Sequence, residues 1–267
     1  MRVAALQLNA KPNIHDNITE ILILAKKALD DGAELIATPE NSCFIKAKTE
    51  EKLRASFSEE NHPTLHALQN FAKENSVFIS IGSLSIKISD TQMANRSFFI
   101  NKAGEIIARY NKIHLFDVRL QTGEVHQESL YFKGGNVPCL TEINGHKIAL
   151  SICYDVRFPE LYRIYAEKGA EILLIPAAFT VPTGTAHWHT LLKARAIENQ
   201  CFVIAAAQTG IHEVGRKTYG HSLIIDPWGQ VLGDAGEHIG IITADLSFEQ
   251  LKEVRSSVPC LMHRKIF

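Results

Sequence analysis

The hydrophobic residues follow two different spacings in the first forty positions of the chain. Between residues 13 and 31 they recur every three or four positions, which predicts an amphipathic helix that ends at Gly32. Residues 1–8 and 34–40 are instead short alternating or apolar runs, which are typical of strands. Because a proline ends the second run, Glu40 is predicted to lie just beyond the carboxyl end of a strand.

The same alternation of strands and helices continues to the end of the chain. Further helices are predicted at residues 62–75, 159–168, 188–200 and 247–256. Strands are predicted at residues 77–88 with a break at Gly82, at 97–101, 105–110, 148–152, 171–179 and 201–208, and on both sides of a turn at 226–229. The pair Asn144-Gly145 has the signature of a two-residue hairpin turn. Helix-connected strands with inserted hairpins predict an α/β fold in which helices cover the sheets, although the pattern does not give the strand order.

Length and composition favour a single domain over residues 1–267, because 46% of the 267 residues are hydrophobic and can form one large core. The formal net charge is −1 with both signs mixed along the chain, so no surface for nucleic acid or anionic lipid is indicated. No run has the length of a membrane span, and the first eight residues lack the apolar stretch of a signal peptide. The predicted partner is a small, neutral or weakly anionic molecule.

The cysteines and histidines indicate no disulfide framework and no structural metal. The five cysteines are odd in number, widely spaced and without a Cys-x-x-Cys pair, which favours a reducing cytoplasm. They are Cys43, Cys139, Cys153, Cys201 and Cys260, of which all but Cys153 are interpreted as inert thiols. His62 and His66 are four positions apart on a predicted helix, but no third ligand accompanies them. We interpret both as surface histidines.

Cys153 occupies a position that suits a nucleophile. It follows the buried strand at 148–152 and precedes a helix that begins near Pro159. Unpaired backbone N–H groups and the positive end of a helix dipole lie at such a junction, and both lower the pKa of a thiol. A single cysteine at a strand end is more often a small core residue, so its interpretation depends on partners elsewhere in the chain.

Two partners, Glu40 and Lys112, are predicted in equivalent positions. Each of these residues, like Cys153, follows an apolar strand at its carboxyl end, which is where open α/β sheets place their ligands. Apolar neighbours make Lys112 a partly buried ammonium, which needs a carboxylate partner. The three residues supply a thiol nucleophile, a carboxylate that moves its proton and a cation for an oxyanion.

These segments resemble the Glu-Lys-Cys signatures of the nitrilase superfamily, the carbon–nitrogen hydrolases. The matching stretches are Thr38-Pro-Glu-Asn41, Asn111-Lys-Ile-His-Leu-Phe-Asp117 and Cys153-Tyr-Asp-Val-Arg-Phe-Pro-Glu-Leu161. The resemblance implies an αββα sandwich that pairs to αββααββα in a homodimer. It also implies amide hydrolysis without a metal or organic cofactor, a second glutamate that matches Glu128, and an oxyanion contact from the backbone N–H of Tyr154.

Within the superfamily the chain is similar to the deaminated-glutathione amidases. The similarity lies in residues 184–188, 193–200, 205–208, 219–222 and 226–229. It implies hydrolysis of deaminated glutathione to 2-oxoglutarate and Cys-Gly. The ω-amidases, which act on 2-oxoglutaramate and 2-oxosuccinamate, are the alternative, and another small amide remains open. Both groups usually carry a Pro-Gly loop after the position of Asp117, whereas residues 119–123 keep only the glycine.

Other residues of the chain, and other classes of protein, offer alternatives to this hypothesis. Arg157 and Lys133 are the candidates for binding a distal carboxylate of the substrate. His187 and His189 could suggest a Cys-His protease, but they open an amphipathic helix that we expect at a subunit contact. An isochorismatase-like hydrolase would normally use aspartate as its acid, and a non-enzymatic thiol sensor would not need all three residues. The predicted site is therefore Glu40, Lys112 and Cys153.

Overall fold

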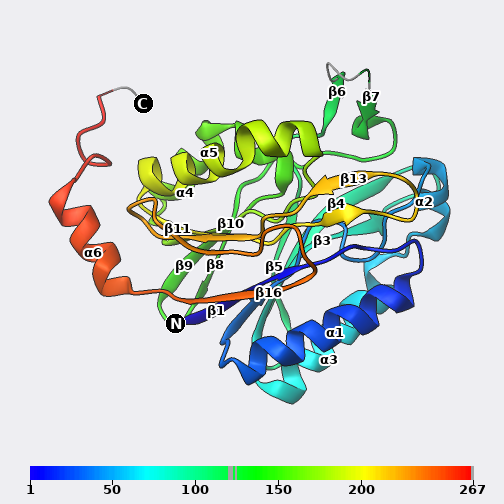
Figure 1. Cartoon of the computed structure of the whole chain (residues 1–267), viewed down its shortest axis with the longest axis horizontal. Helices are drawn as coiled ribbons and strands as arrows, with labels where there is room; N and C mark the ends of the chain where they lie inside the picture. The colour runs from blue at the N-terminus through cyan, green and yellow to red at the C-terminus, as the bar shows by residue number, and fades with distance from the viewer. Residues whose placement is uncertain (120–122, 124, 266–267) are drawn as a thin grey trace.

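The protein, described here by a computed structural model over residues 1–119, 123 and 125–265, is built of four layers (Figure 1). Helices α1 (Ile14–Asp30) and α3 (Pro63–Asn75) cover the outer face of one six-stranded sheet. Helices α4 (Pro159–Glu167) and α5 (Val181–Asn199) cover the other sheet. The two sheets pack against each other between the helices, so the predicted αββα sandwich is confirmed.

The first sheet has the strand order β16-β1-β2-β3-β4-β5. Its strands are β1 (Arg2–Gln7), β2 (Leu35–Ala37), β3 (Phe78–Lys87), β4 (Met93–Ile100), β5 (Ile106–Asn111) and β16 (Gly240–Asp245). The three central strands β1, β2 and β3 are parallel, and the other neighbours are antiparallel. Parallel strands end at one edge of a sheet, so the loop after β2 opens at the same edge as the loop after β1.

The second sheet has the order β15-β14-β11-β10-β9-β8. Its strands are β8 (Cys139–Ile143), β9 (His146–Leu150), β10 (Ile172–Leu174), β11 (Phe202–Ala205), β14 (Leu223–Ile225) and β15 (Val231–Asp234). Again the central strands, β9, β10 and β11, are parallel. The hairpin turn between β8 and β9 has positive φ at Asn144 (51°) and Gly145 (80°), as a type I′ turn requires.

Smaller elements lie around the sandwich. They are α2 (Thr49–Ala55), α6 (Phe248–Ser257) and the hairpins β6 (Asp117–Arg119) with β7 (Val125–Gln127) and β12 (Thr209–Ile211) with β13 (Lys217–Tyr219). Figure 1 shows α2, β13 and the β6–β7 hairpin toward the same side of the molecule. No helix among the described residues is both long and apolar enough to cross a membrane.

Strand β1 shows how the core holds the layers together. Val3 and Ala5 join the core that includes the space between the sheets, whereas Ala4 and Leu6 pack on the side of α1. All four side chains are fully buried. Because successive side chains of a strand point to opposite faces, a sheet covered on both sides needs apolar residues at consecutive positions, as β1 has from Val3 to Leu6.

Several elements differ from their predicted bounds: β4 begins at Met93 rather than at residue 97, and β10 ends at Leu174 rather than at residue 179. The differences at α5 and β3 have a local cause. Helix α5 begins at Val181 rather than at residue 188, since Pro182 suits the first turn of a helix. The helix includes a glycine, Gly184, because α5 approaches Tyr219 so closely there that a Cβ on residue 184 would lie 2.2 Å from the tyrosine ring. Strand β3 continues through Gly82, and the predicted break is a shift of register against β4 between Ile81 and Leu84.

The interpretation of His62 as a surface histidine is wrong. Its side chain is fully buried at the start of α3, where it packs edge-on against Phe57 with ring centroids 5.8 Å apart. Neither ring nitrogen has a hydrogen-bond partner, and burial together with the neighbouring His66 lowers the pKa of His62 to about 4. The cause is the segment before α3, which covers the first turn of the helix and leaves only His66 exposed.

Candidate functional site

Glu40, Lys112 and Cys153 come together between the two sheets at the ends of their strands. Lys112 directly follows β5, and its Nζ donates to Glu40 Oε1 at 3.0 Å. The Cys153 side chain is within hydrogen-bonding contact of Glu40. All three residues are buried, with exposed fractions of 3% for Glu40, 2% for Lys112 and 8% for Cys153. The structure therefore joins the three residues that the sequence pattern selected.

Cys153 lies in a strained turn. Its φ is 49°, in the left-handed region that a residue with a Cβ rarely adopts and that costs roughly 1–3 kcal/mol. Its N–H donates to Pro176 O at 2.8 Å, and a short 3₁₀ helix, Cys153–Arg157, follows at once. The N–H of Tyr154 is in the first turn of that helix, where backbone donors have no partner within the helix.

Asp155, which sequence reasoning missed, fixes this turn to the loop that carries Lys112. Its buried carboxylate accepts from the N–H of Ile152 at 2.8 Å and from the hydroxyl of Tyr110 at 2.7 Å. The other oxygen accepts from the N–H of His114 at 3.0 Å. Tyr110 and His114 flank Lys112, so Asp155 sets the position of the ammonium relative to the thiol. A charged residue two positions after Cys153 in an apolar segment was the available signal.

Glu40 is held by a close approach of two backbones. Gly82 of β3 lies so near the loop after β2 that a Cβ on residue 82 would be 2.0 Å from Thr38 O. The N–H of Ala178 donates to Glu40 Oε2 at 2.9 Å, and Asn95 Nδ2 donates to Glu40 Oε1 at 2.9 Å. Both carboxylate oxygens are therefore fixed. Neither Asn95 nor Ala178 carries a recognisable pattern in the sequence, because both reach Glu40 only through the folded sheets.

Glu128 is the third charged residue of the site, beside Glu40 and Lys112. Lys112 Nζ donates to Glu128 Oε2 at 2.9 Å, and the N–H of Phe116 donates to the same oxygen at 2.7 Å. Asn95 joins the two carboxylates, since its Nδ2 also donates to Glu128 Oε1 at 3.0 Å. Burial by itself lowers the pKa of Lys112, but Glu128 and Glu40 raise it well above the ordinary value. Lys112 is consequently a permanent ammonium between two glutamates.

The charge state of the resting site differs from the expected one. Burial acts to raise the pKa of Glu40, but the Lys112 ammonium and the hydrogen bonds from Lys112 and Cys153 lower it to about 2. Burial and the Glu40 carboxylate raise the pKa of the Cys153 thiol well above its ordinary value, and Lys112 offsets this only in part. The expectation of a lowered thiol pKa is wrong, because the turn is buried beside a carboxylate. The resting pair is a carboxylate and a neutral thiol.

A cavity of about 860 Å³ opens onto these residues. Arg157 lines it, with its guanidinium 5.8 Å from the centroid of the Tyr154 ring and 5.3 Å from that of Phe179. Lys133 is exposed and is not among the described residues that line the cavity, so this candidate for a distal carboxylate is wrong. Residues 120–122, where a Pro-Gly motif was missing from the sequence, lie outside the described residues.

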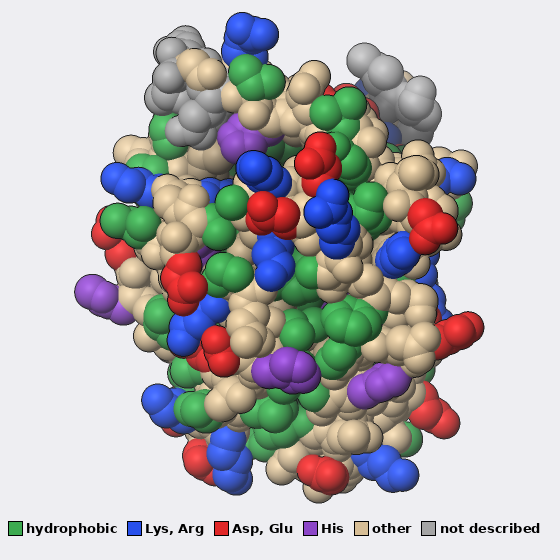
Figure 2. Space-filling view, turned by 90° about the vertical axis from the view of Figure 1, so that its right-hand side faces the viewer, with side chains coloured by type: hydrophobic (Ala, Val, Ile, Leu, Met, Phe, Trp, Pro, Cys, Tyr) green, Lys and Arg blue, Asp and Glu red, His purple; other side chains and the backbone are tan. Residues whose placement is uncertain are grey.

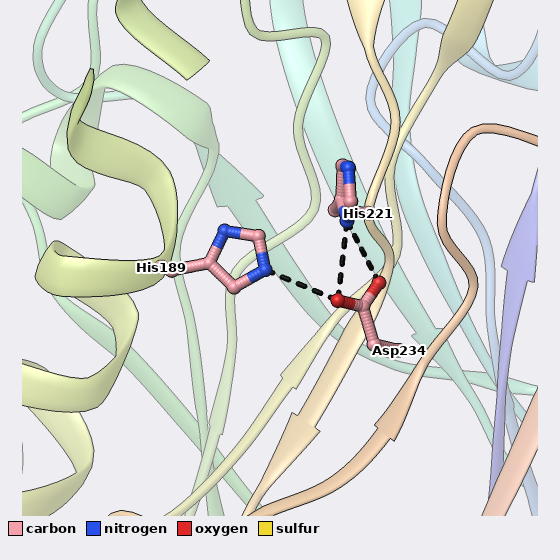
Figure 3. A group of neighbouring side chains, drawn as sticks. All are labelled: His189, His221 and Asp234. Atoms are coloured by element: carbon pink, nitrogen blue, oxygen red, sulfur yellow. Dashed lines mark hydrogen bonds and ion pairs between the residues drawn. The ribbon is translucent and has the colours of Figure 1, made fainter. Parts of the chain in front are cut away.

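His187 and His189 take part in other contacts. His187 Nδ1 is 3.3 Å from a guanidinium nitrogen of Arg157. Figure 3 shows His189 from α5 and His221 both directed at the carboxylate of Asp234, at 3.1 Å and 2.9 Å. Two imidazoles and a carboxylate are ligands that Zn²⁺ accepts, and their nearest atoms lie within 4.8 Å of one another. In this arrangement the carboxylate serves as the acceptor for both rings.

The chain is similar to proteins of known class over nearly its whole length. The sequence pattern of the family described as carbon-nitrogen hydrolase matches residues 2–256. A protein of Synechocystis sp. (strain PCC 6803) that is named deaminated glutathione amidase is 43% identical over 265 residues, which covers 98% of this chain and 97% of that protein.

Solved structures give the same comparison in three dimensions. The crystal structure of the C. elegans NitFhit protein matches 99% of this chain with a TM-score of 0.92 and 34% identity, and the chain spans 65% of that longer protein. A variant of the amidase from Nesterenkonia sp. AN1 matches with a TM-score of 0.82 and 27% identity, over 97% of this chain and 98% of that one. That structure shows the result of Michael addition of acrylamide at the active site cysteine.

Proposed function

The chain belongs to the carbon–nitrogen hydrolase family, and from that premise we propose that it is an amidase with Cys153 as nucleophile, Glu40 as general base and Lys112 as the oxyanion cation. The geometry of the buried site carries this proposal. The ionised Glu40 carboxylate is in contact with the neutral Cys153 thiol and with the Lys112 ammonium, so a base, a nucleophile and a cation meet at one point. The resting pKa values oppose proton transfer, so Glu40 takes the proton only as the sulfur bonds to the carbonyl carbon.

In the proposed reaction Glu40 takes the proton of the Cys153 thiol while the sulfur attacks the amide carbonyl carbon. The oxyanion is stabilised by the Lys112 ammonium and by the N–H of Tyr154. Glu40 then gives its proton to the leaving amine as the C–N bond breaks, which leaves a thioester on Cys153. Water, deprotonated by Glu40, hydrolyses the thioester, and the proton returns to the sulfur. Glu128 orients Lys112 and does not move a proton.

For the substrate we propose deaminated glutathione, with 2-oxoglutarate and Cys-Gly as products. The name of the Synechocystis relative supports this choice. A cavity of about 860 Å³ is toward the upper end for small-molecule sites, and it suits a tripeptide-sized amide better than a five-carbon ω-amide. We place the reaction in a reducing compartment, the cytoplasm, because Cys153 must stay a thiol and all five cysteines are unpaired.

The test of the catalytic roles is mass spectrometry of the protein after reaction with an activated amide. Wild type should carry an acyl group on Cys153, and Cys153→Ala should carry none and lose turnover. Glu40→Gln should also lose acylation, whereas Glu128→Gln should keep it. Lys112→Met should lower the rate by ~10²–10³, which is typical for loss of an oxyanion donor. Cys260→Ala, a change of an exposed cysteine, is the control and should behave as wild type.

Acylation that persists in Cys153→Ala, or near-normal turnover by Lys112→Met, would contradict these roles. The substrate is tested separately by kcat/KM for deaminated glutathione against 2-oxoglutaramate. A preference of more than tenfold for deaminated glutathione, about 1.4 kcal/mol in transition-state binding, supports the proposal. The reverse preference would identify the protein as an ω-amidase.

A further inference from the structure

The cavity beside Cys153 is lined by more cations than the proposed reaction needs. Among the described residues, six lysines and arginines line it and only two glutamates do. The cations are Lys46, Lys52, Lys112, Arg157, Arg216 and Lys217, and the glutamates are Glu40 and Glu128. Lys112 already pairs with both glutamates. The remaining cations have no acidic counterpart in the lining, so the cavity is electropositive and favours an anionic occupant.

Arg216 has a buried hydrogen-bond donor without an acceptor. Its Nη2 donates to Ala178 O at 2.9 Å. The N–H of the same residue, Ala178, donates to Glu40, so the guanidinium is anchored close to Glu40. Its Nε is buried and has no partner. A buried donor left unpaired costs about 1–3 kcal/mol, more for a charged group, so the native fold keeps Arg216 in this place at a cost to stability. A ligand that accepts from Nε would remove that cost.

Lys52 is a second cation in the cavity, and its hydrogen-bond partner is a neutral side chain. It projects from α2, where its Nζ donates to Asn41 Oδ1, next to Glu40, and lies 5.0 Å from the centroid of the Phe132 ring. Burial lowers the pKa of its ammonium, the Glu128 and Glu40 charges raise it, and the charge of Arg216 lowers it again. Within residues 1–119, 123 and 125–265, neither Lys52 nor Arg216 forms an ion pair with a carboxylate.

Two like charges that interact in one cavity repel each other, and among the described residues no carboxylate forms an ion pair with either. Lys52 comes from α2 and Arg216 from the turn between β12 and β13, and these elements lie toward the same side of the molecule (Figure 1). Figure 2 views that side and shows Lys and Arg side chains gathered with Asp and Glu side chains on its upper half. A carboxylate would accept from the Arg216 guanidinium and from the Lys52 ammonium and would cancel their repulsion.

We propose that Lys52 and Arg216 form an anion subsite that binds a carboxylate of the amide substrate. This subsite rests on the proposed amidase function and names the residues that select its substrate, an amide that carries a carboxylate within reach of the thioester carbon. The carboxylate belongs either to the acyl part or to the leaving group. Both sources have the same chemistry, and they are separated by the choice of substrates below.

The variants are Lys52→Gln and Arg216→Gln, with Lys133→Gln as the matched control, because Lys133 is exposed and outside the described lining of the cavity. The readout is the ratio of kcat/KM for a charged substrate to kcat/KM for its methyl ester, which lacks the charge. 2-Oxoglutaramate and its ester test a carboxylate of the acyl part, and deaminated glutathione and its glycyl methyl ester test that of the leaving group. We expect the ratio for one of the two pairs to fall at least tenfold in each variant, mainly through KM, and both ratios to stay at the wild-type value in the control. Ratios within twofold of wild type for both pairs in both variants would overturn the subsite.

A second measurement separates the subsite from a structural role of Arg216 at Ala178. If Arg216 only positioned the Ala178 peptide, Arg216→Gln would lower kcat equally for the charged and the neutral substrate, and that result would overturn its part in the subsite. Arg216→Lys keeps the charge but loses Nε–H, so we expect a ratio between those of wild type and Arg216→Gln. Circular dichroism of each variant establishes that it is folded.

A binding experiment tests the subsite without turnover. Calorimetric titration of Cys153→Ala with 2-oxoglutarate probes a carboxylate of the acyl part, and titration with Cys-Gly probes that of the leaving group. One of the two should bind at least tenfold more weakly when Lys52→Gln is added to Cys153→Ala. Equal affinity for both ligands in the two proteins would overturn the subsite. A failure of the amidase proposal gives a different result from a failure of the subsite, since the wild-type protein would then carry no acyl adduct on Cys153.

Discussion

Cys153 is suited to catalysis by its geometry and its neighbour rather than by the acidity of its thiol. The sequence places it at a strand-to-helix junction, where backbone N–H groups and a helix dipole favour a thiolate. The structure shows that burial and the Glu40 carboxylate oppose this effect and raise the thiol pKa. The thiol pKa differs from the expected one because of Glu40. This residue is 113 positions before Cys153 in the sequence and becomes its neighbour only when the two sheets pack together.

His62 makes stability depend on pH. Its folded-state pKa of about 4 lies below the ordinary value of 6.5, so between these values the unfolded chain binds a proton that the folded chain does not. Stability is therefore lost as the pH falls from 6.5 toward 4, by up to about 3 kcal/mol at 1.36 kcal/mol per pKa unit. His62→Leu should flatten the fall of Tm over this range. Thermal unfolding from pH 7 to pH 4 measures it.

The matched control for this prediction is His66→Leu, since His66 lies one turn along α3 on its exposed side. It should keep most of the wild-type dependence of Tm on pH, because burial lowers the pKa of His62 more than His66 does. Because neither ring nitrogen of His62 has a partner, an apolar residue of similar size should leave the protein as stable as wild type, or more stable, at pH 7. The same slope of Tm against pH in His62→Leu and wild type would contradict the prediction, because groups other than His62 would then cause the loss of stability at low pH.

At the scale of elements, Gly82 determines where the loop after β2 lies. A Cβ at this position would be 2.0 Å from Thr38 O and 2.5 Å from Pro39 O, so Gly82→Ala must push that loop and Glu40 away. We expect a loss of at least about 2 kcal/mol in the free energy of unfolding. A displacement of Glu40 by about 1 Å should lower kcat by about a hundredfold. Urea unfolding and steady-state kinetics measure the two effects.

Gly240→Ala is the control, because nothing lies within 4 Å of a Cβ added there. It should change the free energy of unfolding by less than about 0.5 kcal/mol, as a surface substitution does. If Gly82→Ala were as stable and as active as Gly240→Ala, the close approach of β3 to the 38–40 loop would not be what positions Glu40.

The long helices, most strands of the two sheets and the strand-end residues were predictable because each rests on local spacing, whereas α2 and the hairpins β6–β7 and β12–β13 were not predicted. Glu40, Lys112 and Cys153 could be selected because each follows an apolar run at its carboxyl end. Asp155 and Asn95 were missed, since their importance lies in contacts across 41 to 55 positions, and only Asp155 left a local signal as a charge in an apolar segment. Residues that reach the site from irregular or short elements, such as Lys52 on α2 and Arg216 in a hairpin turn, were missed for the same reason.

The whole molecule has one face whose exposed apolar residues need an explanation. Ile164 on α4 is 37% exposed, Ile197 on α5 is 50% exposed and Trp228 in the turn before β15 is 62% exposed. These elements adjoin, because Arg163 of α4 donates to Glu198 O of α5 at 2.9 Å and Ile197 packs against the turn at Gly229. Neighbouring exposed apolar residues on a folded surface mark an interface, and an isologous one pairs the same patch on two subunits.

We therefore expect a homodimer formed through α4 and α5, in which each sandwich adds its layers to those of the other. Light scattering should give about twice the chain mass of 29.7 kDa. Ile197→Glu should shift the particle to the monomer mass while circular dichroism stays unchanged, because a charge at the centre of the interface is buried without a partner. Ile23→Glu is the control, since Ile23 is 54% exposed on α1 in the opposite outer layer. A wild-type protein that runs as a stable monomer would contradict the dimer. An Ile197→Glu variant that stays dimeric while Ile23→Glu dissociates would place the interface on another face.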